Sequence, residues 1–166
     1  MRLLSIIGRL ALVAGLLVPA LPALAGPTET ALLTKYEGTW KGKGTVSGPN
    51  PGSVVCRLTF KTATSGKLNY SGRCSFGAGG TSFNGAMIYN DAKNRFESVS
   101  SSTGFSATTI GKKQGAGIVF VMTPTVTTYG TASSTMTLGS SSIKLSFKLV
   151  DKKGQTTASS ISFAKS

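Results

Sequence analysis

Histidine is absent from this 166-residue chain, and residues that usually accompany it in catalytic and metal sites are few. There are two cysteines and five acidic residues against 18 lysines and arginines. Without histidine the chain lacks the commonest general base, the histidine-activated nucleophiles and most ligation of transition metals and haem. We therefore expect no catalytic residues, no metal site and no cofactor, and a protein that binds a ligand or partner rather than an enzyme.

Long apolar sequence is confined to the first 25 residues, which have the pattern of a secretory signal peptide. Arg2 and Arg9 supply a positive start, residues 10–21 an apolar core, and Ala23-Leu24-Ala25 a small-x-small cleavage site. We expect residues 1–25 to be removed and residues 26–166 to form a single β-barrel domain. The expected location is periplasmic or secreted.

Acidic residues are too scattered to suggest a catalytic pair. Asp91 and Asp151 lie in turn-like sequence and Glu29 lies near the start of the mature chain. A paired-carboxylate site would have to use Glu37 and Glu97, and nothing in their spacing supports one.

The excess of lysine and arginine over acidic residues makes the protein strongly basic, with a formal net charge of +13 for the whole chain. Such charge either maintains solubility or attracts an anionic partner.

The mature sequence is typical of antiparallel β-structure. One helical stretch is expected at residues 28–36, where Leu32, Leu33 and Tyr36 have helical spacing. Short alternating runs follow, separated by Gly, Ser, Asn and Asp clusters. The expected strands are residues 39–47, 54–62, 67–76, 81–89, 95–101, 105–110, 116–123, 131–138, 142–150 and 156–164. Residues 111–115, which include Gly111 and Gly115, are expected to form a turn.

The alternation also predicts which side chains face the core. In residues 142–150, Ile143, Leu145, Phe147 and Leu149 alternate with polar residues. The serine-rich stretch at residues 98–102 keeps one apolar residue in its alternation, Val99. Eight to ten such strands must close into a barrel or pair as a sandwich to protect their edges. We expect an all-β, antiparallel up-and-down barrel.

Cys56 and Cys74 are predicted to form a structural disulfide. An even cysteine count in an exported chain favours one. A turn centred on Ser65 places Phe60 opposite Tyr70 and Cys56 opposite Cys74, where opposed Cβ atoms lie roughly 4.5 to 5.5 Å apart. A redox or metal-binding pair is disfavoured because histidine and the Cys-x-x-Cys spacing are missing.

The segment Tyr36-Glu37-Gly38-Thr39-Trp40-Lys41-Gly42 resembles the start of the first strand in lipocalin, avidin and related calycin barrels. In those families the tryptophan packs across the closed end of the barrel, under a basic side chain from the last strand. The resemblance implies that Trp40 packs there with Leu33 and Tyr36. Near the end of this chain the basic residue is Lys165, where those families have an arginine.

Two functions follow from the resemblance. Lipocalin-like barrels hold a small apolar or amphipathic ligand in the lumen, for which the inward-facing candidates are Phe60, Tyr70, Phe83, Met87 and Phe147. Exported metalloprotease inhibitors of the Inh type are calycin barrels with one disulfide near the N-terminus, and this arrangement is similar in outline. We favour lumen binding, with inhibition of a secreted protease as the alternative.

The charge supports a third possibility, contact with an anionic lipid or lipopolysaccharide surface. The candidate residues are Lys144 and Lys148 on the polar face of residues 142–150, and Lys152 and Lys153 in the following turn. Aromatic residues interleave with lysines as in single-strand-binding proteins, but most fall on apolar faces. No nucleic-acid partner is expected.

Overall fold

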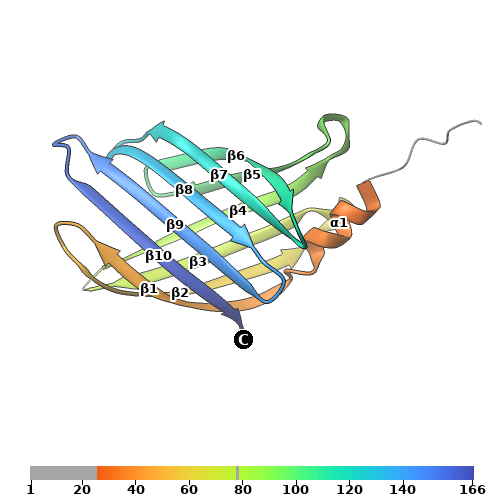
Figure 1. Ribbon diagram of the computed structural model, residues 1–166, viewed down its shortest axis with the longest axis horizontal. Coiled ribbons are helices and arrows are strands. Elements are labelled where there is room, and N and C mark those ends of the chain that lie inside the picture. The colour runs from red at the N-terminus through yellow and green to blue at the C-terminus, as the bar shows by residue number, and fades with distance from the viewer. Residues whose placement is uncertain (1–25, 78) are drawn as a thin grey trace, which may run out of the picture.

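The computed structural model describes residues 26–77 and 79–166, so the predicted signal peptide lies outside the described residues. The described chain forms one closed barrel of ten antiparallel strands with a short helix at one end (Figure 1). The helix is α1 (Gly26–Thr34). The strands are β1 (Gly38–Ser47), β2 (Gly52–Thr62), β3 (Leu68–Phe76), β4 (Gly79–Asn90), β5 (Arg95–Ser102), β6 (Phe105–Gln114), β7 (Gly117–Val126), β8 (Gly130–Leu138), β9 (Ser142–Asp151) and β10 (Thr156–Lys165).

The topology is the predicted up-and-down barrel. Each strand pairs with the strands before and after it in sequence, and β1 pairs with β10 to close the ring. The closing ladder places Trp40 opposite Lys165 and Ser47 opposite Ala158. A sandwich would leave β1 and β10 as edges, whereas this ladder satisfies the backbone groups of both strands.

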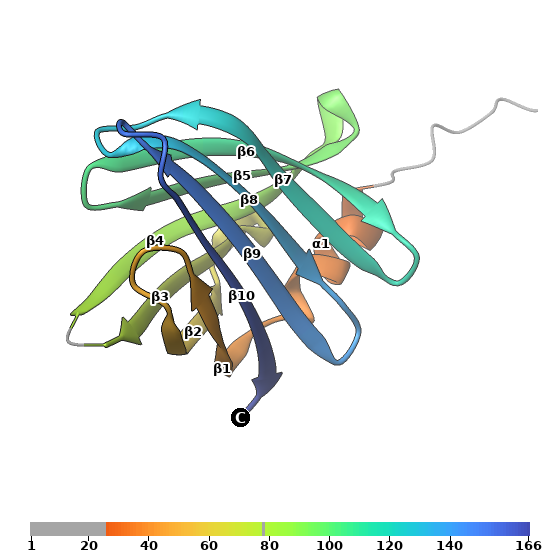
Figure 2. The same cartoon turned by 60° about the vertical axis from the view of Figure 1, so that its left-hand side comes forward.

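The helix covers one end of the barrel. It contacts β4 and the β2–β3 turn, and Figure 2 shows it beside the barrel wall. Leu32 and Leu33 are buried, and Glu29 forms an ion pair with Lys113 of β6 at 3.3 Å. The helix ends two residues before the predicted boundary, and the chain then turns through hydrogen bonds from the Tyr36 and Glu37 amides to Leu33 and Thr34 carbonyls.

The expected turn at residues 111–115 was wrong over most of its length, because β6 continues to Gln114. Gly111 lies inside the strand, where a Cβ atom would come within 2.6 Å of the Phe120 ring and 2.9 Å of the Phe96 Cβ. The glycine makes room for neighbouring aromatic rings. Gly115, which has a φ of 57°, occupies the turn itself.

The disulfide forms as predicted. β2 and β3 pair with Phe60 opposite Tyr70, Leu58 opposite Gly72 and Cys56 opposite Cys74. The turn between these strands contains Ser65 in the left-handed region, with a φ of 64°. Cys56 and Cys74 are bonded, and both side chains are buried on the inner face of the barrel.

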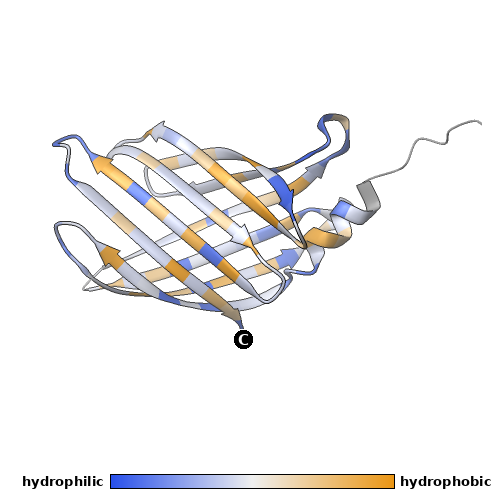
Figure 3. Cartoon of the chain, viewed as in Figure 1, coloured by the Kyte–Doolittle hydropathy of each residue, from blue (hydrophilic) through white to orange (hydrophobic). Residues whose placement is uncertain are grey.

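The interior is not packed uniformly. A large cluster beneath the helix contains Leu33, Trp40, Leu58, Phe60 and Phe163, all buried. Toward the other end a smaller cluster of Ala107, Met122 and Ala132 is bordered by partly buried side chains. Figure 3 shows hydrophobic and hydrophilic residues alternating along the strands. In the described ranges, no helix has the length and apolar character to cross a membrane.

Candidate functional site

The barrel encloses a cavity of about 480 Å³ on the side away from the helix. Its walls come from inward-facing side chains of strands β1 to β10. Phe76, Phe105 and Tyr129, which also line it, lie at or next to strand ends opposite the helix, so this end is the mouth of the cavity. The space exists because inward-facing side chains here include many serines and threonines, which do not fill a barrel of ten strands as leucines and phenylalanines do at the closed end.

Large apolar side chains line one side of the cavity. On β9 the inward residues are Leu145, Phe147 and Leu149, and Ile161 continues this wall on β10. The alternating pattern of β9 predicted this face, and Lys144 and Lys148 point outward as expected. Leu145, Phe147 and Leu149 are only partly buried, so a ligand in the cavity would cover apolar surface that is now open.

The opposite side carries hydroxyl groups. Ser98, Ser100 and Ser102 of β5 face the cavity, and Thr109 lies beside them on β6, directly opposite Ser98. In the ring order β5 lies nearly across the barrel from β9 and β10. Among the described residues that line the cavity, none is charged. Hydroxyl groups also occur beside the apolar wall, at Ser134 of β8 and Ser159 of β10, and Phe83 and Phe105 lie on the strands next to β5. The lumen therefore combines apolar surface with neutral hydrogen-bonding groups.

Tyr70 extends the hydroxyl side into the lumen. Its hydroxyl lies 3.4 Å from the Ser98 Oγ and donates to the Val99 carbonyl at 3.3 Å. Burial raises the pKa of Tyr70 above its ordinary value, so the phenol is neutral at physiological pH. Tyr70 and Ser98 can exchange the hydrogen bond between them for one to a ligand.

The closed end has the arrangement that the calycin resemblance implies. Trp40 is 2% exposed and its indole Nε1 donates to the Tyr36 carbonyl at 2.9 Å. The Tyr36 hydroxyl donates to the Leu138 carbonyl at 2.8 Å, which ties the segment after α1 to β8. The Nζ of Lys165 lies 5.6 Å from the Trp40 ring centroid, so lysine takes the position where the calycin families have an arginine.

Four of the five predicted lumen residues line the cavity: Tyr70, Phe83, Met87 and Phe147. Phe60 also faces inward, but it is 1% exposed and packs in the cluster beneath the helix. The serine row on β5 was missed by the sequence reasoning, and the available signal was the alternation of Ser98, Ser100 and Ser102 within residues 98–102. Val99, the apolar residue of that stretch, points outward and is 52% exposed.

The four lysines predicted to contact anionic surfaces are exposed, but they do not form a compact cluster. Lys144 and Lys148 lie along β9, opposite Ser162 and Ala158 of β10. Lys152 and Lys153 lie in the β9–β10 turn, at the mouth end of the barrel. The strand separates Lys144 from Lys152 by eight residues, or roughly 26 Å at about 3.3 Å per residue.

No family model matches the sequence, and no curated protein matches it. Solved structures match the fold. The crystal structure of Rv2717c from M. tuberculosis aligns with a TM-score of 0.63 at 13% sequence identity, over 82% of this chain and 96% of that chain. The S-type phycobiliprotein lyase CPES from Guillardia theta aligns with a TM-score of 0.55 at 11% identity, over 85% of this chain and 93% of that chain. The chain folds as a calycin-like barrel.

Proposed function

We propose that this protein is an exported, non-enzymatic binding protein that holds a small, uncharged amphipathic ligand in its lumen. The observation that carries the proposal is the cavity of about 480 Å³, with its apolar side chains on β9 and its row of hydroxyl groups on β5. Pockets of a few hundred Å³ with apolar walls and a few placed polar groups are typical of small-molecule sites. Export is supported by the signal-like N-terminus and by the disulfide, since disulfides persist in oxidising compartments.

The lining also predicts which head group the ligand carries. A neutral polar group buried without a hydrogen bond costs on the order of 2 to 7 kcal/mol, and a carboxylate buried without a cation costs more. Because the lining side chains named above are neutral, a ligand with hydroxyl, carbonyl or amide groups suits the lumen better than a fatty acid. Tyr70 and Ser98 are positioned to hydrogen-bond such a group.

A binding assay with a matched pair of variants tests the proposal. A neutral solvatochromic dye, Nile red, should gain fluorescence with the wild-type protein. Ser134→Trp fills the lumen from β8, whereas Ser146→Trp adds the same side chain to the exposed outer face of β9. We expect Ser134→Trp to weaken dye binding at least tenfold and Ser146→Trp to leave it unchanged.

Competition then tests the head-group preference. A long-chain alcohol should displace the dye at lower concentration than the fatty acid of equal chain length. Native mass spectrometry of protein purified from its own source should detect a retained neutral ligand. Failure of the wild-type protein to take up any apolar or amphipathic probe, or equal uptake by Ser134→Trp, would reject lumen binding.

A further inference from the structure

Three basic side chains lie directly opposite one another on the outer wall of the barrel. The β1–β2 register pairs Lys41 with Arg57, and the β2–β3 register pairs Arg57 with Arg73. All three are exposed. Opposed residues in antiparallel strands have Cβ atoms about 4.5 to 5.5 Å apart, and like charges at that separation are destabilising. This basic row therefore weakens the folded protein unless something anionic neutralises it.

The protein supplies no such neutralisation on this wall. Strands β1 to β4 contain no Asp or Glu in their described residues. Within the described ranges, the ion pairs join Lys93 and Arg95 to Glu97, and Lys113 to Glu29.

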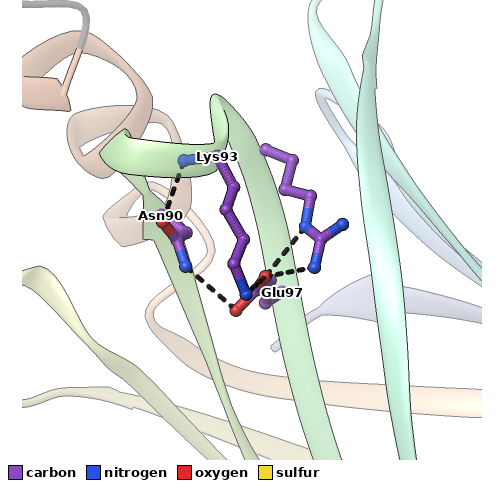
Figure 4. A network of polar contacts seen from close by, with 4 residues as sticks. Asn90, Lys93 and Glu97 are labelled. Atoms are coloured by element: carbon purple, nitrogen blue, oxygen red, sulfur yellow. Dashed lines mark hydrogen bonds and ion pairs between the residues drawn. The ribbon is translucent and has the colours of Figure 1, made fainter.

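Glu97, on the neighbouring strand β5, is already paired with other groups. Arg95 contacts it with Nη2 at 2.7 Å and Nε at 2.8 Å, and the Asn90 Nδ2 donates to it at 3.3 Å (Figure 4). Hydrogen bonding to Arg95, and then to Asn90, lowers the pKa of Glu97 below its ordinary value, so it stays ionised and paired in place. The basic row is left to face solvent.

The two arginines border a shallow groove of about 540 Å³ on the outside of β2 to β5. The rest of its lining is neutral: Gly72, Phe83 and a set of hydroxyl and amide side chains. Ser82 continues the basic row, since it lies opposite Arg73. The adjacent row in the groove follows the strand registers from Thr59 through Ser71 and Asn84 to Ser101. Hydroxyl and amide groups beside two guanidinium groups can donate to several oxygens of one anion.

We propose that this groove binds a phosphate group, with Arg57 and Arg73 as its charged contacts. Guanidinium groups match phosphate geometry with paired hydrogen bonds, and a tetrahedral oxyanion has enough oxygens to use the flanking Ser82 and Asn84 as well. The group belongs either to a soluble phosphate monoester or to a lipid headgroup. Its two arginines lie on the outer wall of the barrel, whereas no charged side chain of the described residues lines the lumen; Phe83, Ser101, Ser102 and Thr103 border both hollows.

Calorimetric titration with glycerol 3-phosphate at low ionic strength tests the proposal. The variant is Arg57→Gln/Arg73→Gln, and the control Lys67→Gln/Lys112→Gln removes the same charge from exposed positions outside the groove. We expect the arginine variant to lose at least tenfold in affinity and the control to stay within twofold of the wild type. Equal losses in both variants would indicate a general electrostatic field and reject the site.

Two further measurements keep the proposal testable if the arginine variant folds poorly. In a wild-type NMR titration with the same monoester, resonances of Arg57, Arg73 and Ser82 should shift, whereas shifts confined to other strands would overturn the assignment. Vesicles of phosphatidylglycerol should bind through the same arginines if the source is a lipid. The proposal is supported if the wild type binds the monoester, the vesicles or both, and if that binding is lost when Arg57 and Arg73 are replaced. It is refuted if the wild type binds neither.

Discussion

At the scale of single residues, Trp40 shows how one side chain joins three parts of the chain. It is the third residue of β1, its indole donates to the Tyr36 carbonyl just after the helix, and Lys165 of β10 lies over its ring. The closing ladder makes this contact possible because Trp40 and Lys165 are directly opposite in the β1–β10 register. The lysine stem also covers the ring from solvent, as long charged side chains commonly do.

Removing the positive charge of Lys165 should slightly destabilise the closed end of the barrel. Cation–π contacts at exposed sites contribute about 0.5 to 1 kcal/mol. We expect Lys165→Met to lower the free energy of unfolding by about 0.5 kcal/mol, from that contact, and Lys165→Arg to preserve it. Urea unfolding followed by Trp40 fluorescence measures both variants.

The same fluorescence reports the environment of Trp40. The native emission should be blue-shifted and poorly quenched by iodide, because the indole is almost fully buried. The control for Lys165→Met is Lys144→Met, which removes a lysine from the outer face of β9 and should leave the free energy of unfolding unchanged. A red-shifted, fully quenchable tryptophan would contradict the packing at the closed end.

At the scale of elements, the β2–β3 hairpin combines a turn, a register and a crosslink that agree with one another. The turn at Ser65 determines the register, and the register brings Cys56 opposite Cys74. The bond closes a loop with a sequence separation of 18. It therefore restricts the unfolded chain mainly within this hairpin.

Loss of the crosslink should lower stability without changing the fold. A disulfide closing a loop of this length contributes about 3 kcal/mol. We expect Cys56→Ala/Cys74→Ala to lower the melting temperature by about 10 °C in a domain of this size, measured by calorimetry. Free-thiol titration of the denatured wild-type protein should find no thiols. Two reactive thiols, or an unchanged melting temperature, would contradict a stabilising disulfide.

At the scale of the whole molecule, the barrel wall separates two environments. The lumen is lined by apolar and hydroxyl side chains, whereas the basic row of Lys41, Arg57 and Arg73 lies on the outside. Strand alternation places neighbouring residues on opposite sides of this wall, so Cys56 and Cys74 face inward while Arg57 and Arg73 face outward.

The two proposed sites should respond differently to salt. Exposed charges are screened beyond about 8 Å at physiological ionic strength, whereas burial of a neutral ligand involves no charge pair. We expect Nile red binding to be nearly independent of salt, and glycerol 3-phosphate binding to weaken strongly between low and high salt. Arg57→Gln/Arg73→Gln should keep full dye binding. Dye binding that falls in parallel with phosphate binding would show that one site accounts for both.

Local patterns in the sequence were sufficient for the ten strands, the β2–β3 register and the disulfide. Period-2 alternation and turn residues act over a few neighbours, so they need no knowledge of distant strands. The register that pairs Cys56 with Cys74 also pairs Arg57 with Arg73, so two of the three residues of the basic row were already opposed in that prediction.

Only the tertiary structure decided closure through β1 and β10, the hollow in the lumen and the direction of the β5 serines. Hydrophobic alternation indicates an inner face where that face carries apolar side chains, as on β9. It fails on β5, where Val99 points outward and Ser98 inward, because a strand that borders a cavity can carry small hydroxyl side chains on its inner face. The position of Lys41 beside Arg57 likewise depends on the β1–β2 register, in a part of the wall, β1 to β4, whose described residues include no Asp or Glu.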